Sequence, residues 1–162
     1  MSSPTTPSCP RVASNRPCRR RPNGLTTTGM YSLDSNVAID VFRRPHGRLR
    51  ARLIEAQSRG LLGVSSVVLF ELHFGVLRGT SPNGHERLAR FLSGVSDVYA
   101  FDAEDAVSAG ELRQDLEKQG RKIGPYDTLI AAQALRRGLT LVTANIREFE
   151  RIPGLRLENW RE

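Results

Sequence analysis

Three lone carboxylates stand out in this chain because each lies in an apolar, regularly patterned segment. Asp34 follows the apolar run at residues 30–33, Glu71 lies inside the run at 67–72, and Asp127 precedes the run at 128–132. A charge buried without a partner is costly, so such a group must be neutralised, paired or bound to a metal ion. Three such acids in one small domain indicate a shared cation and therefore metal-dependent chemistry.

Two neutral residues extend this candidate site. Ser35 follows Asp34, and Asn145 follows an apolar run that ends at Thr143. A set of ligands composed only of oxygen favours Mg²⁺ or Mn²⁺ over zinc. The three histidines do not form a metal motif, and the sequence contains no Ser-His-Asp motif, Walker loop or dinucleotide-binding glycine loop.

Each of these residues also has a purely structural interpretation, which the sequence leaves open. Asp34 and Asp127 could cap the helices that follow them. Glu71 could be an ion-pair partner or a surface residue, and Asn145 could be a turn residue. Glu71 is expected to share one helix face with four residues: Val67, Val68, Leu72 and Gly75.

The net charge of +7 is concentrated at the N-terminal end of the chain. Residues 1–29 hold five of the 24 lysines and arginines and no acid, so residues 30–162 hold 19 basic residues against 17 acids. This segment is rich in Pro, Ser, Thr and Arg without an apolar period, and we expect it to be a disordered basic extension. The favoured interpretation is a mispredicted start codon, since a strand pattern begins at Met30, and a basic arm for nucleic acid is the alternative.

The cysteines and the hydropathy indicate where the protein works. Cys9 and Cys18 both lie in the first 29 residues, so the remaining chain has no Cys nucleophile, zinc–thiolate site or internal disulfide. This pattern is typical of the reducing cytoplasm. No stretch approaches 18 apolar residues, so we expect no membrane span.

Strands and helices alternate along the part of the chain that must position the candidate residues. Strands are expected at residues 30–33, 61–64, 95–101, 139–143 and 155–158, with helices at 35–42, 49–59, 66–77, 85–93, 103–119, 126–137 and 146–150. Pro45 should break the chain after the first helix, and Asp102 should cap the fifth. The second helix is expected to turn its apolar residues inward: Leu49, Leu53, Ile54 and Ala56.

This alternation predicts one α/β domain over residues 30–160, with a parallel β-sheet flanked by helices on both faces. Sites in such sheets form at the carboxyl ends of the strands, where Asp34 and Asn145 are expected. Two arginine clusters, at residues 43–52 and 136–151, could bind the phosphates of a phosphodiester substrate or could simply be solvated surface.

Four segments carry the candidate residues in a fixed order. They are Met-Tyr-Ser-Leu-Asp-Ser-Asn-Val at 30–37, Ser-Ser-Val-Val-Leu-Phe-Glu-Leu at 65–72, the stretch at 123–132 around Asp127, and the stretch at 141–149 around Asn145. Together with the ending at 152–160, they resemble PIN-domain toxins of the VapC family from type II toxin–antitoxin systems. Two departures exist: Ser35 replaces the usual Thr, and Asn145 stands where many PIN domains have a fourth acid. The second departure leaves open whether one metal ion binds or two.

The resemblance implies a PIN-like fold and a metal-dependent endoribonuclease that acts as the toxin of a toxin–antitoxin pair. Asp34, Glu71 and Asp127 would bind Mg²⁺, for which Mn²⁺ can substitute, and Ser35 and Asn145 would orient the attacking water. The substrate would be RNA of the translation apparatus, with transfer RNA favoured. The partners would be a cognate antitoxin and a second copy of the chain in a homodimer.

Two other functions remain as alternatives. A non-catalytic PIN-fold module would bind RNA or a protein without cleaving anything, although Asp34 and Asp127 are both retained. A phosphatase of the haloacid dehalogenase type would also start from an aspartate at a strand end, but it would need a second acid two residues later. Asn36 occupies that position.

Overall fold

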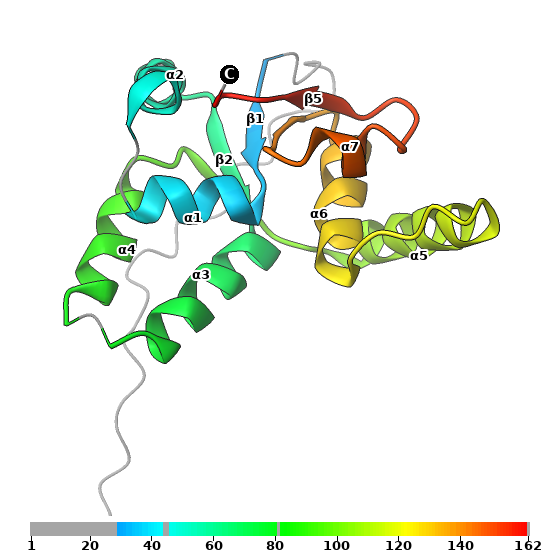
Figure 1. Cartoon of the computed structure of the whole chain (residues 1–162), viewed down its shortest axis with the longest axis horizontal. Helices are drawn as coiled ribbons and strands as arrows, with labels where there is room; N and C mark the ends of the chain where they lie inside the picture. Colours follow the sequence, from blue (N-terminus) through cyan, green and yellow to red (C-terminus); the bar gives the residue numbers. More distant parts are fainter. Residues whose placement is uncertain (1–28, 44–45, 81, 162) are drawn as a thin grey trace, which may run out of the picture.

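The structure is a computed structural model that describes residues 29–43, 46–80 and 82–161. Five short strands form one parallel sheet in the order β3-β2-β1-β4-β5 (Figure 1). The strands are β1 (Tyr31–Leu33), β2 (Leu62–Ser65), β3 (Asp97–Tyr99), β4 (Thr140–Val142) and β5 (Arg156–Glu158). The predicted parallel α/β fold is therefore confirmed, and every predicted strand is present within two residues of its expected bounds.

The described residues also contain all of the predicted helices. They are α1 (Ser35–Arg43), α2 (Gly47–Ser58), α3 (Ser66–Arg78), α4 (Gly84–Ser93), α5 (Ala103–Lys118), α6 (Pro125–Arg136) and α7 (Ile146–Phe149). Residues 1–28 of the predicted basic extension at 1–29, and the predicted break at Pro45, lie outside the described residues. None of the described helices is long and apolar enough to cross a membrane.

Local capping explains where two of these helices begin. The Ser65 hydroxyl accepts a hydrogen bond from the backbone N–H of Val67 at 3.1 Å, which satisfies a free donor at the start of α3. Asp102 and Asp105 form a reciprocal capping box at the start of α5, each carboxylate accepting from the other residue's backbone N–H. The predicted cap at Asp102 is therefore confirmed.

The direction of the crossovers changes once along the chain, and this change creates a topological switch point between β1 and β4. The chain passes from β1 to β2 and β3 on one side, then returns to place β4 on the other side of β1. Right-handed crossovers then put helices on opposite faces of the sheet. Accordingly, α1, α3 and α4 pack together while α5 packs on α6, and Figure 1 shows the two groups on either side of β1 and β2. Ligands bind at the carboxyl ends of strands where the order reverses, here between β1 and β4.

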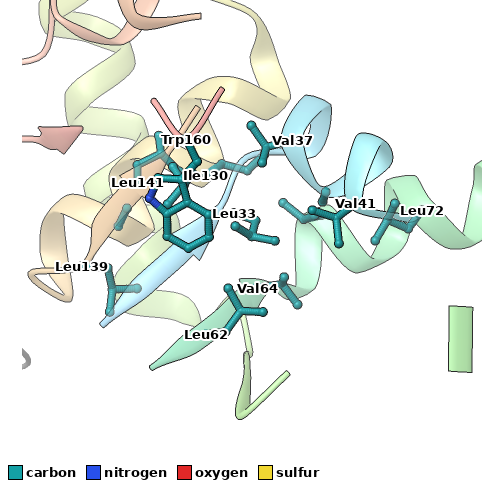
Figure 2. Packing of buried hydrophobic residues seen from close by; sticks show 14 of the residues in the cluster. Leu33, Val37, Val41, Leu62, Val64, Leu72, Ile130, Leu139, Leu141 and Trp160 are labelled. Carbon is teal, nitrogen blue, oxygen red and sulfur yellow. The ribbon is translucent and has the colours of Figure 1, made fainter. Parts of the chain in front are cut away.

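A mainly aliphatic core holds this arrangement in place (Figure 2). Leu33, Leu62, Val64 and Leu141 contribute from the strands and are fully buried, and Trp160 closes the core near the C-terminus. The position of Ile54 corrects the sequence prediction, because its side chain is 53% exposed. The buried face of α2 follows the spacing of Leu49, Leu53 and Ala56, and Ile54 lies about 100° around the helix from Leu53.

Candidate active site

Asp34 lies where β1 ends, and it joins β1 to the end of β4. Its backbone N–H donates to the carbonyl oxygen of Val142 at 2.9 Å, which continues the strand pairing by one residue. Its carboxylate accepts from the backbone N–H of Ser35 at 2.7 Å and from the hydroxyl of Thr143 at 3.0 Å. The side chain is 1% exposed. Asp34 is therefore held rigidly at the point where the strand order reverses.

The environment of Asp34 disfavours its charged form. The pKa of Asp34 is raised to about 6, mainly by burial and in smaller part by the negative charges of Asp127 and Glu71. The hydrogen bonds from Thr143 and Ser35 act in the opposite direction without offsetting the effect of burial. A buried carboxylate with a raised pKa at a strand end is a candidate functional group rather than a surface acid.

Glu71 is brought to Asp34 through Ser35. The Ser35 hydroxyl donates a hydrogen bond to Glu71 Oε2, while its backbone N–H bonds to Asp34. Glu71 is half-buried on the side of α3 that also carries Val68 and Leu72, and no described lysine or arginine forms an ion pair with it. The ion-pair interpretation of Glu71 is therefore wrong for the described residues.

The predicted apolar face of α3 needs one correction. Gly75 was expected beside Glu71, but it is exposed, and an added Cβ there would meet nothing within 4 Å. The buried line of the helix runs instead through Val68, Leu72 and Val76. These residues follow i, i+4 spacing, whereas Gly75 lies about 100° away from Val76.

Asp127 reaches the same region from the first turn of α6. The N-cap of this helix is Gly124, so the interpretation of Asp127 as the cap is wrong. An added Cβ at Gly124 would meet Asp127 Oδ2 at 2.6 Å, so the glycine leaves room for the carboxylate. Burial raises the pKa of Asp127, and the negative charges of Glu148 and Glu71 raise it further.

Glu148 is the residue that sequence reasoning missed. Asn145 precedes α7, its backbone N–H donates to the Thr143 hydroxyl at 3.0 Å, and its side-chain amide donates to Glu148 Oε2 at 3.1 Å. Because Glu148 raises the pKa of Asp127, it belongs to the same electrostatic group. The available signal was the spacing of three residues between Asn145 and Glu148, which puts both on one side of a helical turn.

These four carboxylates fit a divalent cation by charge and by donor chemistry. All the donors are oxygens, as Mg²⁺ and Mn²⁺ prefer, and no described lysine or arginine pairs with Asp34, Glu71, Asp127 or Glu148. As the side chains stand, no three acidic, histidine or cysteine residues within the described part of the chain are close enough to hold a metal ion. Glu71 and Glu148 are each held by a neutral donor, so direct coordination by three acids requires these side chains to rotate.

Part of the predicted basic surface has a structural role instead. Arg136 and Arg137 bond to Asp105, which is fully buried, at 2.7 Å each, and both also contact Asp102. These contacts fix α6 to the start of α5, so the two arginines are not available to hold a phosphate. Arg147 lies on α7 beside the site and forms no ion pair with a described residue.

Comparisons with known proteins identify similar sequences and structures. Residues 31–155 match the model of the PIN domain family. The chain is 35% identical over 130 residues to the tRNA(fMet)-specific endonuclease VapC of Salmonella typhimurium, covering 80% of this chain and 97% of that protein. It is 37% identical over 132 residues to ribonuclease VapC2 of Rickettsia felis, covering 81% and 98%. The crystal structure of VapBC2 from Rickettsia felis bound to promoter DNA contains a chain with a TM-score of 0.76 and 36% identity, again covering 81% and 98%.

Proposed function

Because this chain belongs to the PIN-domain family of VapC ribonuclease toxins, we propose that it is a metal-dependent endoribonuclease that cleaves RNA of the translation apparatus. One observation carries the proposal. Four carboxylates from β1, α3, α6 and α7 act on one another at the carboxyl edge of the sheet, and no described basic residue pairs with them. Such a group has the charge and the oxygen donors that a divalent cation needs.

The metal-binding role is proposed for Asp34, Glu71 and Asp127, with Glu148 beside them. Mg²⁺ is the proposed metal, and Mn²⁺ can substitute for it. The bound cation would supply Lewis acidity and offset the charge that develops on the reacting phosphate. Neighbouring residues of the chain hold these ligands in position: Thr143 and the Ser35 backbone fix Asp34, and the Ser35 hydroxyl fixes Glu71.

Ser35 and Asn145 are proposed to orient the attacking water. Each already links two members of the site: Ser35 contacts Asp34 and Glu71, and Asn145 contacts Thr143 and Glu148. Their side chains carry neutral donors and acceptors, so they can hold a water without adding charge. Arg147, at the edge of the site, is the proposed contact for a neighbouring backbone phosphate.

Transfer RNA is the favoured substrate. Support comes from the Salmonella relative, which is named as specific for tRNA(fMet) and matches this chain over 97% of its own length. Action on such RNA would place the protein in the cytoplasm.

Two partners form part of the proposal. A cognate antitoxin is supported by the similarity to VapBC structures from Rickettsia felis and Salmonella typhimurium. A homodimer is supported by an apolar groove of about 520 Å³ between α3 and α4. Its lining includes Leu77, which is 63% exposed, and exposed apolar surface of this kind marks an interface.

The decisive experiment compares purified wild-type protein with Asp127→Asn and with Asp115→Asn, a control at an exposed position on α5. We expect Mn²⁺-dependent cleavage of transfer RNA by wild type and by Asp115→Asn, and at least a hundredfold slower cleavage by Asp127→Asn with its fold retained. Binding of RNA without cleavage by wild type would favour the non-catalytic module. Release of phosphate from p-nitrophenyl phosphate without RNA cleavage would favour the phosphatase.

A further inference from the structure

Two exposed aromatic residues directly precede acids of the candidate site in the sequence. Tyr126 precedes Asp127 and is 46% exposed, and Phe70 precedes Glu71 and is 52% exposed. Consecutive Cα atoms are only about 3.8 Å apart, so each ring is tied to the backbone next to a proposed metal ligand. Exposing rings of this size costs free energy that a purely structural role would avoid.

The rings form a continuous row on the surface of the molecule. The centroids of Tyr126 and Phe70 are 5.9 Å apart with an interplanar angle of 56°, and Phe70 stacks on Phe74 at 6.2 Å and 10°. The guanidinium group of Arg78 lies 5.5 Å from the centre of the Phe74 ring and ends the row. Phe70 therefore packs against one side of Tyr126, the residue that precedes Asp127.

The chemistry of the site shows why such a row is useful. Four carboxylates repel an RNA backbone, and no described basic residue pairs with them, so charge alone attracts RNA poorly at this point. Base stacking on aromatic rings binds single-stranded RNA independently of phosphate charge and tolerates different bases. Pro125, at the first position of α6, restricts the backbone just before Tyr126 and reduces the entropy lost when a base stacks there.

We infer that Tyr126, supported by Phe70, is a stacking site for a nucleobase of single-stranded RNA next to the bond that is cleaved. The inference rests on the proposed ribonuclease function and names the form of its substrate: an unpaired base, as in a loop, rather than a duplex. Tyr126 favours RNA over a second protein copy, because it does not line the apolar groove between α3 and α4 that suits a dimer, whereas Phe70 and Phe74 do.

The test uses an unstructured RNA oligonucleotide that carries one 2-aminopurine, whose fluorescence falls when it stacks on an aromatic ring. Binding is measured with Mg²⁺ in the Asp34→Asn background, which slows cleavage, for Tyr126→Leu, Tyr126→Phe and the control Ile54→Ala on α2. Leucine keeps apolar bulk without a ring, whereas phenylalanine keeps the ring. We expect Tyr126→Leu to lose the quenching and to bind about 5- to 100-fold more weakly, with the other two unchanged. In otherwise wild-type protein, Tyr126→Leu should raise the KM for RNA by a similar factor.

The outcomes separate this inference from the function on which it rests. If wild type cleaves RNA in Mn²⁺ but Tyr126→Leu matches it in quenching, affinity and KM, the stacking site is overturned and the ribonuclease stands. If Tyr126→Leu instead converts a dimer to a monomer in light scattering and leaves RNA quenching intact, the ring belongs to a protein interface and the inference also fails. If wild type neither binds nor cleaves RNA, the proposed function fails, and the inference fails with it.

Discussion

Replacing Asp34 with Asn should stabilise the metal-free protein at neutral and alkaline pH. Asp34 is 1% exposed, and its pKa is raised from 3.8 to about 6, mainly by burial. That difference corresponds to about 3 kcal/mol of free energy of unfolding. Between pH 3.8 and about pH 6 the folded state binds more protons than the unfolded state. The free energy of unfolding of wild type therefore falls as pH rises from about 4 to about 6, and it stays reduced above pH 6.

Asparagine removes the charge and keeps the shape. Its oxygen can still accept from the backbone N–H of Ser35, and its NH₂ group can donate to the hydroxyl oxygen of Thr143. Allowing about 1 kcal/mol for imperfect hydrogen bonds, we expect a net gain of about 2 kcal/mol at pH 8. For a domain of this size the gain corresponds to a melting temperature about 6 °C higher. At pH 4 wild-type Asp34 is largely protonated in the folded state, so the difference should nearly vanish.

Asp105 provides a matched control of opposite sign. It is also a buried aspartate, but Arg136, Arg137 and Gln133 bond to it and hold its pKa well below its usual range. Its charged form therefore contributes stability above about pH 4, which is lost as pH falls. Asp105→Asn should lower the free energy of unfolding at pH 8 by about 3 kcal/mol, since two partly buried guanidinium groups lose their partner.

The assay is thermal unfolding of wild type and both variants in EDTA at pH 4 and pH 8, repeated at pH 8 with Mn²⁺. Wild type should gain about 2.7 kcal/mol when Mn²⁺ exceeds its Kd a hundredfold, and Asp34→Asn should gain much less. A variant at Asp34 that is no more stable than wild type at pH 8 in EDTA, or whose advantage persists at pH 4, would refute the assignment of a buried, unpaired charge.

Three further predictions concern other parts of the molecule. Glu148→Gln should slow RNA cleavage at least tenfold and lower the pKa of Asp127, whereas Glu150→Gln, at an exposed neighbouring position, should cleave like wild type in the same assay. Leu77→Asp should shift the protein from dimer to monomer in light scattering at micromolar concentration. The control Ile54→Asp, which changes an exposed aliphatic residue on α2, should not. Deleting residues 2–29 should leave the melting temperature and the cleavage rate unchanged, and a truncated protein that aggregates would contradict the start-codon interpretation.

Much of the fold follows from short-range patterns that the sequence displays directly. Apolar runs bounded by turn residues predict the five strands, and spacings such as Leu49, Leu53 and Ala56 predict the inward face of a helix. Asp102 predicts a helix start because the cap involves atoms only three residues apart. The candidate acids Asp34, Glu71 and Asp127 also stand out locally, since each interrupts an apolar pattern.

Only the tertiary structure decides which of these residues meet and what each charge faces. Ser35 and Glu71 are 36 residues apart, and Thr143 and Asp34 are 109 apart, so no local pattern could place either pair in contact. Glu148 looks like an ordinary polar residue on a short helix until the fold brings its charge within reach of Asp127. Arg136 and Arg137 resemble a phosphate-binding pair until Asp105 is found buried against them. The physical reason is that burial and electrostatic energy depend on distances in space, and here the order of the parallel strands sets those distances.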